Sequence, residues 1–497
     1  MKRFYWKESF VCVCNSSYCD DVNELGVTTH GKAIIYTSDM KHDRLERTEA
    51  HFKEPVEKLV EITIDASKKR QSIIGFGGCI NDNVAILTQN DDTKGKERRK
   101  KLLNQYFSKS GIEYSVGRVP IGANDASVKE WSFLNHPDDY ELEHFYTLDE
   151  NKIGLIKEIF AISNKIKLFG SAWSVPAWMK DTGVMKGTGR IKGTFNREYY
   201  VLYAKYLIEF IKVFKESGVD FWGLTIMNEP GNQTRTWPGT YITYAEQRDF
   251  VKERLGPMMK HTWYTKDVKI IAHDWHRDRI FDAAMTIYQD NDTMIDGLGV
   301  HWYVPGNWDK LVKTYNLRQD KFILATEATI GGLGHEYGNW QSAEMYAYDI
   351  IKNLQNYVGG WIEWSLWTDT HGGPSYVGNF VGSSIILNRT YGYYDSYEFY
   401  KQPQFYAIGH FSKFLPPDSV IVSSGFDTFD GNSNLQGIAA ETPAGNLVVV
   451  ILNRDKRNVY NLGINDGREN KKILKVTMKP HSIRTIIWKK HNNKIEL

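Results

Sequence analysis

The chain has 497 residues, of which 41% are hydrophobic and 25% are charged, the balance of a globular protein long enough for more than one domain. It contains 62 Lys and Arg residues and 60 Asp and Glu residues, so its formal charge is +2. This near-neutral charge excludes a general electrostatic attraction to nucleic acid. No apolar run approaches the roughly 20 residues of a membrane-spanning helix, so we do not expect a transmembrane protein.

The first 70 residues combine a cysteine cluster with two strand-like stretches, 33–36 and 60–64. Cys12, Cys14 and Cys19 lie close together, and no nearby His or fourth thiol completes a tetrahedral metal set, which favours a disulfide. Cys12 and Cys14 are too close to pair comfortably. We therefore predict a bridge between Cys14 and Cys19, no local partner for Cys12, and a buried free thiol at Cys79.

Short apolar runs alternate with candidate helices over residues 71–413, as in a parallel sheet with crossover helices. Eight runs are nearly continuously apolar, as strands buried on both faces should be: 72–77, 114–119, 167–173, 221–227, 268–272, 297–302, 322–326 and 360–364. The clearest helix is 197–216, with Gly218 as its cap, and others are expected at 98–107, 153–162 and 343–357. Together they predict an α/β fold, a (β/α)8 TIM barrel with an insertion after strand 8.

The region after the barrel has a different pattern, with short alternating strands at 419–422, 447–452 and 482–488. This pattern predicts a β-sandwich over residues 414–497. The strands of residues 1–70 are too few to form a core alone. We therefore expect both chain ends, including the cysteine-rich segment, to meet in one sandwich.

Two carboxylates follow predicted barrel strands. Glu229 follows the fourth strand within Asn228-Glu229-Pro230, and Glu327 ends the seventh. These strands face each other across the barrel mouth, where barrel enzymes carry their chemistry. Glycosidic bond cleavage needs one acid for the leaving oxygen and one carboxylate that attacks the anomeric carbon or activates water. Either Glu alone could be an ordinary charge at the barrel rim, but the pair predicts a glycosidase.

Beside these residues the chain carries short motifs in a specific order, at 11–20, 75–78, 118–120, 173–178, 300–303, 379–382, 400–403 and 409–414. In this order they resemble glycoside hydrolase family 30, and within it the acid β-glucosidases. The resemblance implies Glu327 as the nucleophile and Glu229 as the acid/base. It also implies hydrolysis of the β-glucosidic bond of glucosylceramide through a covalent glucosyl-enzyme, with no cofactor and no metal.

The resemblance also implies a set of substrate contacts: Asp125, Trp173, Asn228, His301, Tyr303, Trp364 and Asn379. Asn228 would donate to the sugar 2-hydroxyl, whereas Asp125 and the two tryptophans would hold the far hydroxyls and the face of glucose. Barrel packing is the alternative for the tryptophans, and a satisfied core position is the alternative for His301.

Arg118, at the end of the predicted second strand, can hold Glu327 ionised through a charge-assisted hydrogen bond, although a structural ion pair would look the same in the sequence. Glu229 must stay protonated for its first role. We therefore expect its pKa to lie above that of Glu327, raised by the charge of its neighbour.

Sequons for N-glycosylation occur at Asn15, Asn232, Asn291 and Asn388, and with the cysteine cluster they indicate the secretory route. No apolar segment follows the basic start, so we expect a signal peptide to be absent from this chain. The resemblance implies the lysosomal lumen, glucosylceramide at a membrane surface and an activator protein of the saposin type.

Two other functions stay open. One is another family 30 activity, such as a β-xylosidase or β-1,6-glucanase, and the other is a non-catalytic glycan-binding barrel. The loop after Pro230 is shorter than in the family and Thr329 stands where a cysteine is usual, so aglycone selection is expected to differ.

Overall fold

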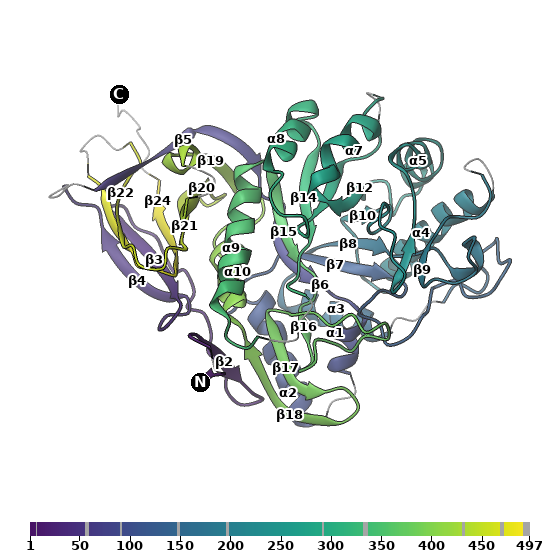
Figure 1. Cartoon of the computed structure of the whole chain (residues 1–497), viewed down its shortest axis with the longest axis horizontal. Helices are drawn as coiled ribbons and strands as arrows, with labels where there is room; N and C mark the ends of the chain where they lie inside the picture. The colour runs from purple at the N-terminus through teal and green to yellow at the C-terminus, as the bar shows by residue number, and fades with distance from the viewer. Residues whose placement is uncertain are drawn as a thin grey trace.

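A computed structural model of the chain describes all residues except 6, 55–58, 90–91, 147–149, 195–197, 291–292, 332–335, 430–432, 468–471 and 491–497. Its centre is a closed barrel of parallel strands (Figure 1). In barrel order these are β6 (Gly75–Cys79), β7 (Val116–Ile121), β8 (Lys167–Ala172), β10 (Gly223–Thr225), β12 (Lys269–His276), β13 (Gly297–His301), β14 (Phe322–Glu327) and β15 (Val358–Glu363). Each predicted apolar run overlaps one of these strands, so the predicted TIM barrel is confirmed.

The barrel interior is filled by side chains, as a packed core rather than a pore. One cluster of barrel side chains contains Val116, Phe169, Ile271, Leu324 and Ile362, all fully buried. A side chain at position 77 would place its Cβ 1.7 Å from the carbonyl oxygen of Val116. Only glycine fits there, which lets β6 and β7 pair closely.

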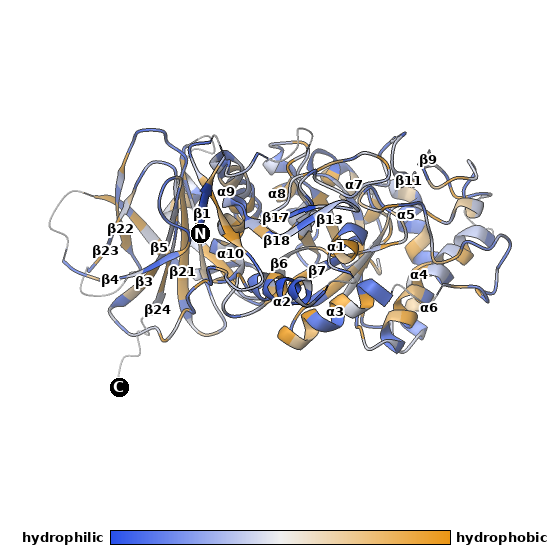
Figure 2. Cartoon of the chain, turned by 90° about the horizontal axis from the view of Figure 1, so that it is seen from below, coloured by the Kyte–Doolittle hydropathy of each residue, from blue (hydrophilic) through white to orange (hydrophobic). Residues whose placement is uncertain are grey.

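Helices surround the barrel and connect its strands. The helix bounds are α1 (Asp82–Leu87), α2 (Thr93–Phe107), α3 (Glu150–Ile162), α4 (Glu198–Glu216), α5 (Tyr244–Phe250), α6 (Gly256–His261), α7 (Ile280–Ile287), α8 (Trp308–Leu317), α9 (Trp340–Gln355) and α10 (Pro403–Ser412). A π-helical segment, η2 (Val251–Leu255), joins α5 to α6, and short 3-10 helices occur at η1 (Ala177–Met179), η3 (Arg277–Arg279) and, outside the barrel, η4 (Gly425–Thr428). Helix α4 buries its aromatic face, and Gly218, at φ +82°, follows its end as predicted. Helix α2 is mostly hydrophilic (Figure 2).

The second core belongs to a sandwich-like sheet that contains strands from both chain ends. The order is β23 (Leu474–Met478), β22 (Tyr460–Asn465), β5 (Val60–Ser72), β19 (Val420–Ser424), β20 (Leu435–Glu441), β21 (Asn446–Asn453), β24 (Ser482–Lys489), β3 (Lys32–Asp39) and β4 (Glu46–His51). Figure 1 shows purple and yellow strands side by side in this sheet. β24 pairs antiparallel with β3, with Ile486 opposite Ile35. The predicted union of the two chain ends is therefore confirmed for β3, β4 and β5.

The cysteine-rich segment does not join that sheet, so this part of the prediction is wrong. β1 (Lys2–Phe4) and β2 (Phe10–Cys14) belong to a separate sheet with β18 (Tyr394–Lys401), β17 (Ile385–Thr390) and β16 (Trp367–Thr368). β2 is buried throughout and pairs antiparallel with β18, with Cys14 opposite Phe399. The insertion after β15 supplies the free strand edge that β2 needs, and Arg3 adds an ion pair to Glu398 at 2.8 Å.

Two short strands, β9 (Gly187–Gly189) and β11 (Pro238–Thr240), pair with each other in the loops that follow β8 and β10. Among the described residues, no helix is both long and apolar enough to cross a bilayer.

Candidate active site

A cavity of about 250 Å³ at the carboxyl ends of the barrel strands brings most of the predicted site residues together. Its lining consists of Asp125, Trp173, Asn228, Glu229, Asn232, Trp237, His276, Tyr303, Glu327, Thr329, Gly331, Trp364, Asn379 and Val381. Two further predicted residues, Arg118 and His301, are fully buried and bond directly to this lining.

The two predicted catalytic carboxylates face each other in this cavity. Glu327 is the last residue of β14, and Glu229 lies beyond β10 at φ +45°, a backbone conformation that is uncommon without glycine. The Glu229 N–H holds this turn by donating to the Asp274 carbonyl at 2.9 Å. One carboxylate oxygen of Glu229 lies within 4.8 Å of one of Glu327. Retaining glycosidases place their carboxyl groups about 5–5.5 Å apart, and inverting enzymes about 6.5–9.5 Å.

Arg118 links the nucleophile candidate to the barrel core. It lies inside β7 rather than at its end, and its Nη1 donates to Glu327 Oε2. Its Nη2 donates to Asn228 Oδ1 at 2.7 Å and to Asp274 Oδ2 at 2.9 Å. Burial opposes a charged guanidinium, but Asp274 and Glu327 raise the pKa of Arg118 above its ordinary value. Glu327 therefore faces a permanent positive charge.

His301, at the end of β13, bridges two carboxylates. Its Nδ1 lies 3.1 Å from Glu229 Oε1, and its Nε2 lies 3.1 Å from Asp274 Oδ1. Burial lowers the pKa of His301, but Glu327, Asp274 and Glu229 together raise it to about 10. Both nitrogens therefore donate to carboxylates. His301 is fully buried outside the cavity lining, so it contacts the acid/base candidate, and its predicted contact with substrate stays a prediction.

The pKa of Glu229 is lowered, whereas a raised pKa was expected for a group that must be protonated before the first step. Burial raises it, but the hydrogen bond and charge of His301 and a 2.6 Å hydrogen bond from Asn232 Nδ2 bring it below its ordinary value. In the ligand-free site Glu229 is thus held as a carboxylate. The expected raised pKa is not found because the predicted neighbour, Glu327, is outweighed by the buried His301.

Asp125 and Asn379 meet at the far side of the cavity. Asn379 Nδ2 donates to Asp125 Oδ2 at 2.6 Å, whereas the buried Oδ1 of Asp125 has no protein partner. Burial, followed by the charge of Glu327, raises the pKa of Asp125 to about 7. An unpaired buried oxygen beside a cavity is a site for a ligand hydroxyl.

Aromatic rings close the remaining walls. Trp173 and Trp364 pack with ring centroids 4.9 Å apart, and the Arg118 guanidinium lies 4.7 Å from the centroid of Trp173. The Tyr303 hydroxyl donates to Glu327 Oε1 at 2.8 Å. The tryptophans are nearly fully buried yet line the cavity, so they serve packing and the pocket together.

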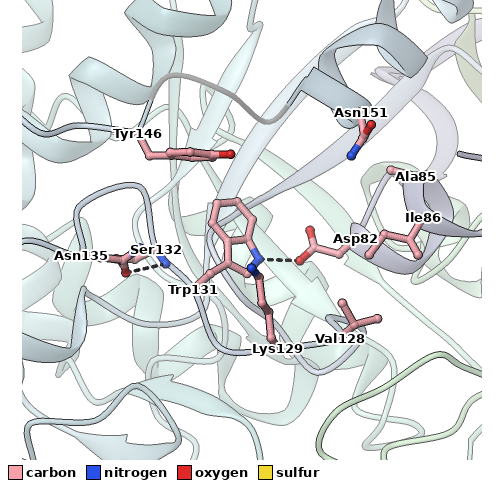
Figure 3. Close-up of a pocket in the computed structure, with 10 residues that line it drawn as sticks. All are labelled: Asp82, Ala85, Ile86, Val128, Lys129, Trp131, Ser132, Asn135, Tyr146 and Asn151. Atoms are coloured by element: carbon pink, nitrogen blue, oxygen red, sulfur yellow. Dashed lines mark hydrogen bonds between the residues drawn. The ribbon is translucent and has the colours of Figure 1, made fainter. Parts of the chain in front are cut away.

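A second cavity, of about 350 Å³, lies beside the loop that carries Asp125 (Figure 3). The carboxylate of Asp82 at its edge accepts from Trp131 Nε1 at 2.7 Å, from Lys152 Nζ at 2.8 Å and from Ser127 Oγ at 2.5 Å. Asp82 and Lys152 are both buried. The ion pair joins α1 and α3, and the hydrogen bonds from Ser127 and Trp131 attach the loop that carries Asp125 to the same carboxylate.

The sequence profile of the Glycosyl hydrolase family 30 TIM-barrel domain matches residues 73–415, and that of the family's β-sandwich domain matches residues 419–486. The chain belongs to glycosyl hydrolase family 30. It is 38% identical to Putative glucosylceramidase 3 of Caenorhabditis elegans, over 97% of this chain and 93% of that protein. It is 32% identical to Lysosomal acid glucosylceramidase of Mus musculus, over 97% and 94%.

Among solved structures, SrfJ from Salmonella typhimurium superposes with a TM-score of 0.84 at 23% identity, covering 93% of this chain and 100% of that one. This likeness shows the shared fold. Membership of family 30 makes the chain a glycoside hydrolase, of the glucosylceramidase-like kind.

Trp237, His276, Gly331 and Val381 also line this family 30 site without having been predicted, and two further unpredicted residues bond its charged groups. Asp274, which bonds Arg118 and His301, lies two residues after the predicted fifth strand, so a search for polar residues after each apolar run could have found it. Asn232 was noted only as a sequon. Its contact with Glu229 depends on the loop after Pro230, and no sequence signal reveals it.

The site offers a poor set of metal ligands. Glu229, His301 and Glu327 lie close enough together to be considered, but both nitrogens of His301 donate to carboxylates and have no lone pair to give. The other such group among the described residues contains Cys14 and Cys19, which are joined in the predicted disulfide. Cys12 and Cys79 are buried free thiols.

The sequons differ in their surroundings. Asn15 lies in a turn next to the disulfide, where its side-chain oxygen accepts from the Ser17 N–H at 2.9 Å. Asn388 Nδ2 donates to Glu398 Oε2 at 3.3 Å, and Asn291 lies outside the described residues. Asn232 lines the active-site cavity.

Proposed function

We propose that the chain is a retaining β-glucosidase that hydrolyses the glucosidic bond of glucosylceramide by double displacement. The observation that carries this proposal is the separation of the two carboxylates, whose nearest oxygens lie within 4.8 Å. This spacing matches retaining enzymes and not inverting ones, which leave room for a water molecule beside the sugar, so direct attack by one carboxylate is favoured.

In the first step Glu327 attacks the anomeric carbon and Glu229 protonates the departing alcohol. The bond to Arg118 and the hydroxyl of Tyr303 fix both oxygens of Glu327. Because these donors hold one rotamer, the attacking oxygen is oriented before the substrate arrives.

In the second step Glu229 takes a proton from water, which attacks the glucosyl ester and releases Glu327. Ester formation removes the negative charge of Glu327. Loss of that charge favours the ionised form of Glu229, which is the base that this step needs. His301 stays in place as a donor to Glu229.

The far end of the cavity supports glucose as the sugar. Asp125 presents an unpaired buried oxygen, and Asn379 fixes its other oxygen. Trp173 and Trp364 provide aromatic surface for the C–H face of a pyranose. Asn228, held by Arg118 at 2.7 Å, lines the cavity beside Glu229, where a 2-hydroxyl would lie.

The names of the relatives support glucosylceramide as the substrate and the lysosomal lumen as the compartment. A glycolipid substrate implies work at a membrane surface, with a saposin-type activator protein as a possible partner. The lowered pKa of Glu229 adds a physical reason for an acidic compartment, since Glu229 must carry a proton for the first step.

The test compares hydrolysis of glucosylceramide in mixed micelles with that of a β-1,6-glucan and of aryl β-glucoside, β-xyloside and β-galactoside at mildly acidic pH, using the wild-type chain and Glu327→Gln. Glucoside and glucosylceramide cleavage that is lost in the variant supports the proposal. Preference for the xyloside, or for a β-1,6-glucan, would keep the mechanism and replace the substrate. No turnover of any substrate by folded protein would favour a glycan-binding barrel.

A further inference from the structure

The loop after Pro230 places an amide directly on the acid/base candidate. Asn232 Nδ2 donates to Glu229 Oε2 at 2.6 Å, while His301 Nδ1 lies 3.1 Å from Oε1. Each carboxylate oxygen of Glu229 therefore has one donor, and the two donors come from different parts of the barrel. Asn232 sets the orientation of the oxygen that His301 does not hold.

The surrounding chain keeps Asn232 in this position. Its backbone N–H donates to the Glu229 carbonyl at 2.9 Å, which closes a tight turn, and its own carbonyl accepts from Thr188 Oγ1 at 3.0 Å. The preceding Gly231 lies against the Trp275 ring, where an added Cβ would come within 2.3 Å. The turn is therefore packed on β12 and linked to β9, so the amide cannot swing away freely.

We propose that Asn232 is a positioning residue that orients Glu229 in both of its protonation states, an inference that rests on the proposed role of Glu229 as acid/base. A primary amide carries a donor at one end and an acceptor at the other. Nδ2 donates to the carboxylate, and after a half-turn about the last side-chain bond Oδ1 accepts from the protonated carboxyl group. Only hydrogen bonds change in this rotation.

A neutral amide suits the charges that already surround Glu229. His301 contributes a positive charge and Glu327 a negative one, whereas Asp125 is mostly neutral below its pKa of about 7, and His276 lines the same cavity. Asp274 contacts the other ring nitrogen of His301, and the Tyr303 hydroxyl donates to Glu327. A further cation at position 232 would lock Glu229 as a carboxylate, and an anion would oppose its ionisation.

The hydrogen bond between Asn232 and Glu229 also affects whether Asn232 can be N-glycosylated. N-glycosylation attaches its glycan to the asparagine Nδ2, and in Asn232 this atom donates to Glu229 inside the cavity. A glycan there would displace the hydrogen bond and fill the substrate cavity. The Asn232 sequon therefore stays unmodified in active enzyme.

The test measures the pH dependence of kcat/KM for Asn232→Ala and Asn232→Asp, on an alkyl β-glucoside and on 2,4-dinitrophenyl β-glucoside. For Asn232→Ala we expect a loss of about 10- to 100-fold on the alkyl glucoside, the range for a hydrogen bond to a charged group. Its basic limb should move up by about one pH unit, since Glu229 loses a donor that stabilises its charge. Asn232→Asp should move the limb further, because it adds a negative charge. The dinitrophenyl substrate needs no acid, so its kcat/KM should change little.

The matched control is Gln233→Ala, an exposed position in the same loop, which should leave both the rates and the pH profile unchanged. A basic limb that stays in place in both Asn232 variants would overturn the proposal, and so would equal losses on the two substrates. Mass spectrometry of active protein from a glycosylating host should show Asn232 unoccupied; an occupied Asn232 in fully active enzyme would also overturn it. Glucosidase activity lost in Glu327→Gln establishes the proposed function separately.

Discussion

The guanidinium of Arg118 lies against the carboxylate of Glu327, with Arg118 fully buried and Glu327 at 9% side-chain exposure. Arg118 also neutralises Asp274, so removing it leaves two buried carboxylates with His301 as the remaining cation beside them. We predict that Arg118→Ala lowers the free energy of unfolding by about 3–5 kcal/mol and abolishes activity.

Arg118→Lys provides the contrast for that prediction, because it keeps the charge but cannot bond two carboxylates in a fork. It should recover part of the stability and little of the activity. Urea denaturation followed by tryptophan fluorescence, with kcat/KM on an aryl glucoside, measures both. Full activity in Arg118→Lys would show that charge alone is needed.

Glu229→Ala should separate the two chemical steps. Substrates with poor leaving groups should lose about 10²–10⁴-fold in kcat/KM, because general acid catalysis supplies that much. 2,4-Dinitrophenyl β-glucoside should still form the glucosyl-enzyme and then stall. Added azide should restore turnover and give the β-glucosyl azide, which NMR of the product identifies. An α-azide would mean that no covalent intermediate on Glu327 precedes the azide attack.

His301 should stabilise the protein most at low pH. Its pKa is raised to about 10 in the folded chain, so its contribution is fully present below the ordinary value of 6.5 and is lost as pH rises from 6.5 through 10. Urea denaturation of the wild type and of His301→Gln at pH 5.5 and pH 9 should show a larger difference at pH 5.5. A difference that does not vary with pH would mean that His301 is neutral in the folded state.

Asp125 should lower the stability of the folded protein at neutral pH and yet be needed for full activity. Its pKa is raised from 3.8 to about 7, so the charged form is penalised, and stability falls as pH rises from about 4 to 7. This cost is at most about 4 kcal/mol at neutral pH. Asp125→Asn should remove this pH dependence while lowering kcat/KM about 10- to 100-fold. Thermal unfolding at pH 4 and pH 7 checks the first point, and an unchanged kcat/KM would contradict the glucose contact.

The barrel could be predicted because its strands are buried on both faces and are therefore marked by continuous apolar runs. Glu327 and His301 lie at strand ends, as these runs indicate, because β14 ends at Glu327 and β13 ends at His301. The place of β2 could not be predicted, since its partner β18 lies almost 400 residues away along the chain, and an apolar strand such as 10–14 carries no information on which edge it will join.

The charges and pKa values of the site residues were harder to predict than which residues form the site. Glu229 and Glu327 alone predict a raised pKa for Glu229, but a buried imidazolium reverses that direction. The charge of His301 depends on Asp274, which comes from a different strand, so only the assembled barrel reveals it. Asn232 is a similar case, because its sequon pattern predicts an exposed glycan site rather than a hydrogen bond inside the cavity.

Double displacement requires Glu327 to attack the sugar and form a covalent intermediate. Incubation with 2-deoxy-2-fluoro-β-D-glucosyl fluoride, followed by proteolysis and mass spectrometry, tests it most directly. We predict one labelled peptide, with the fluoroglucosyl group on Glu327, and no label in Glu327→Gln. Label on another residue would move the nucleophile, and turnover to glucose of inverted configuration without any label would contradict double displacement.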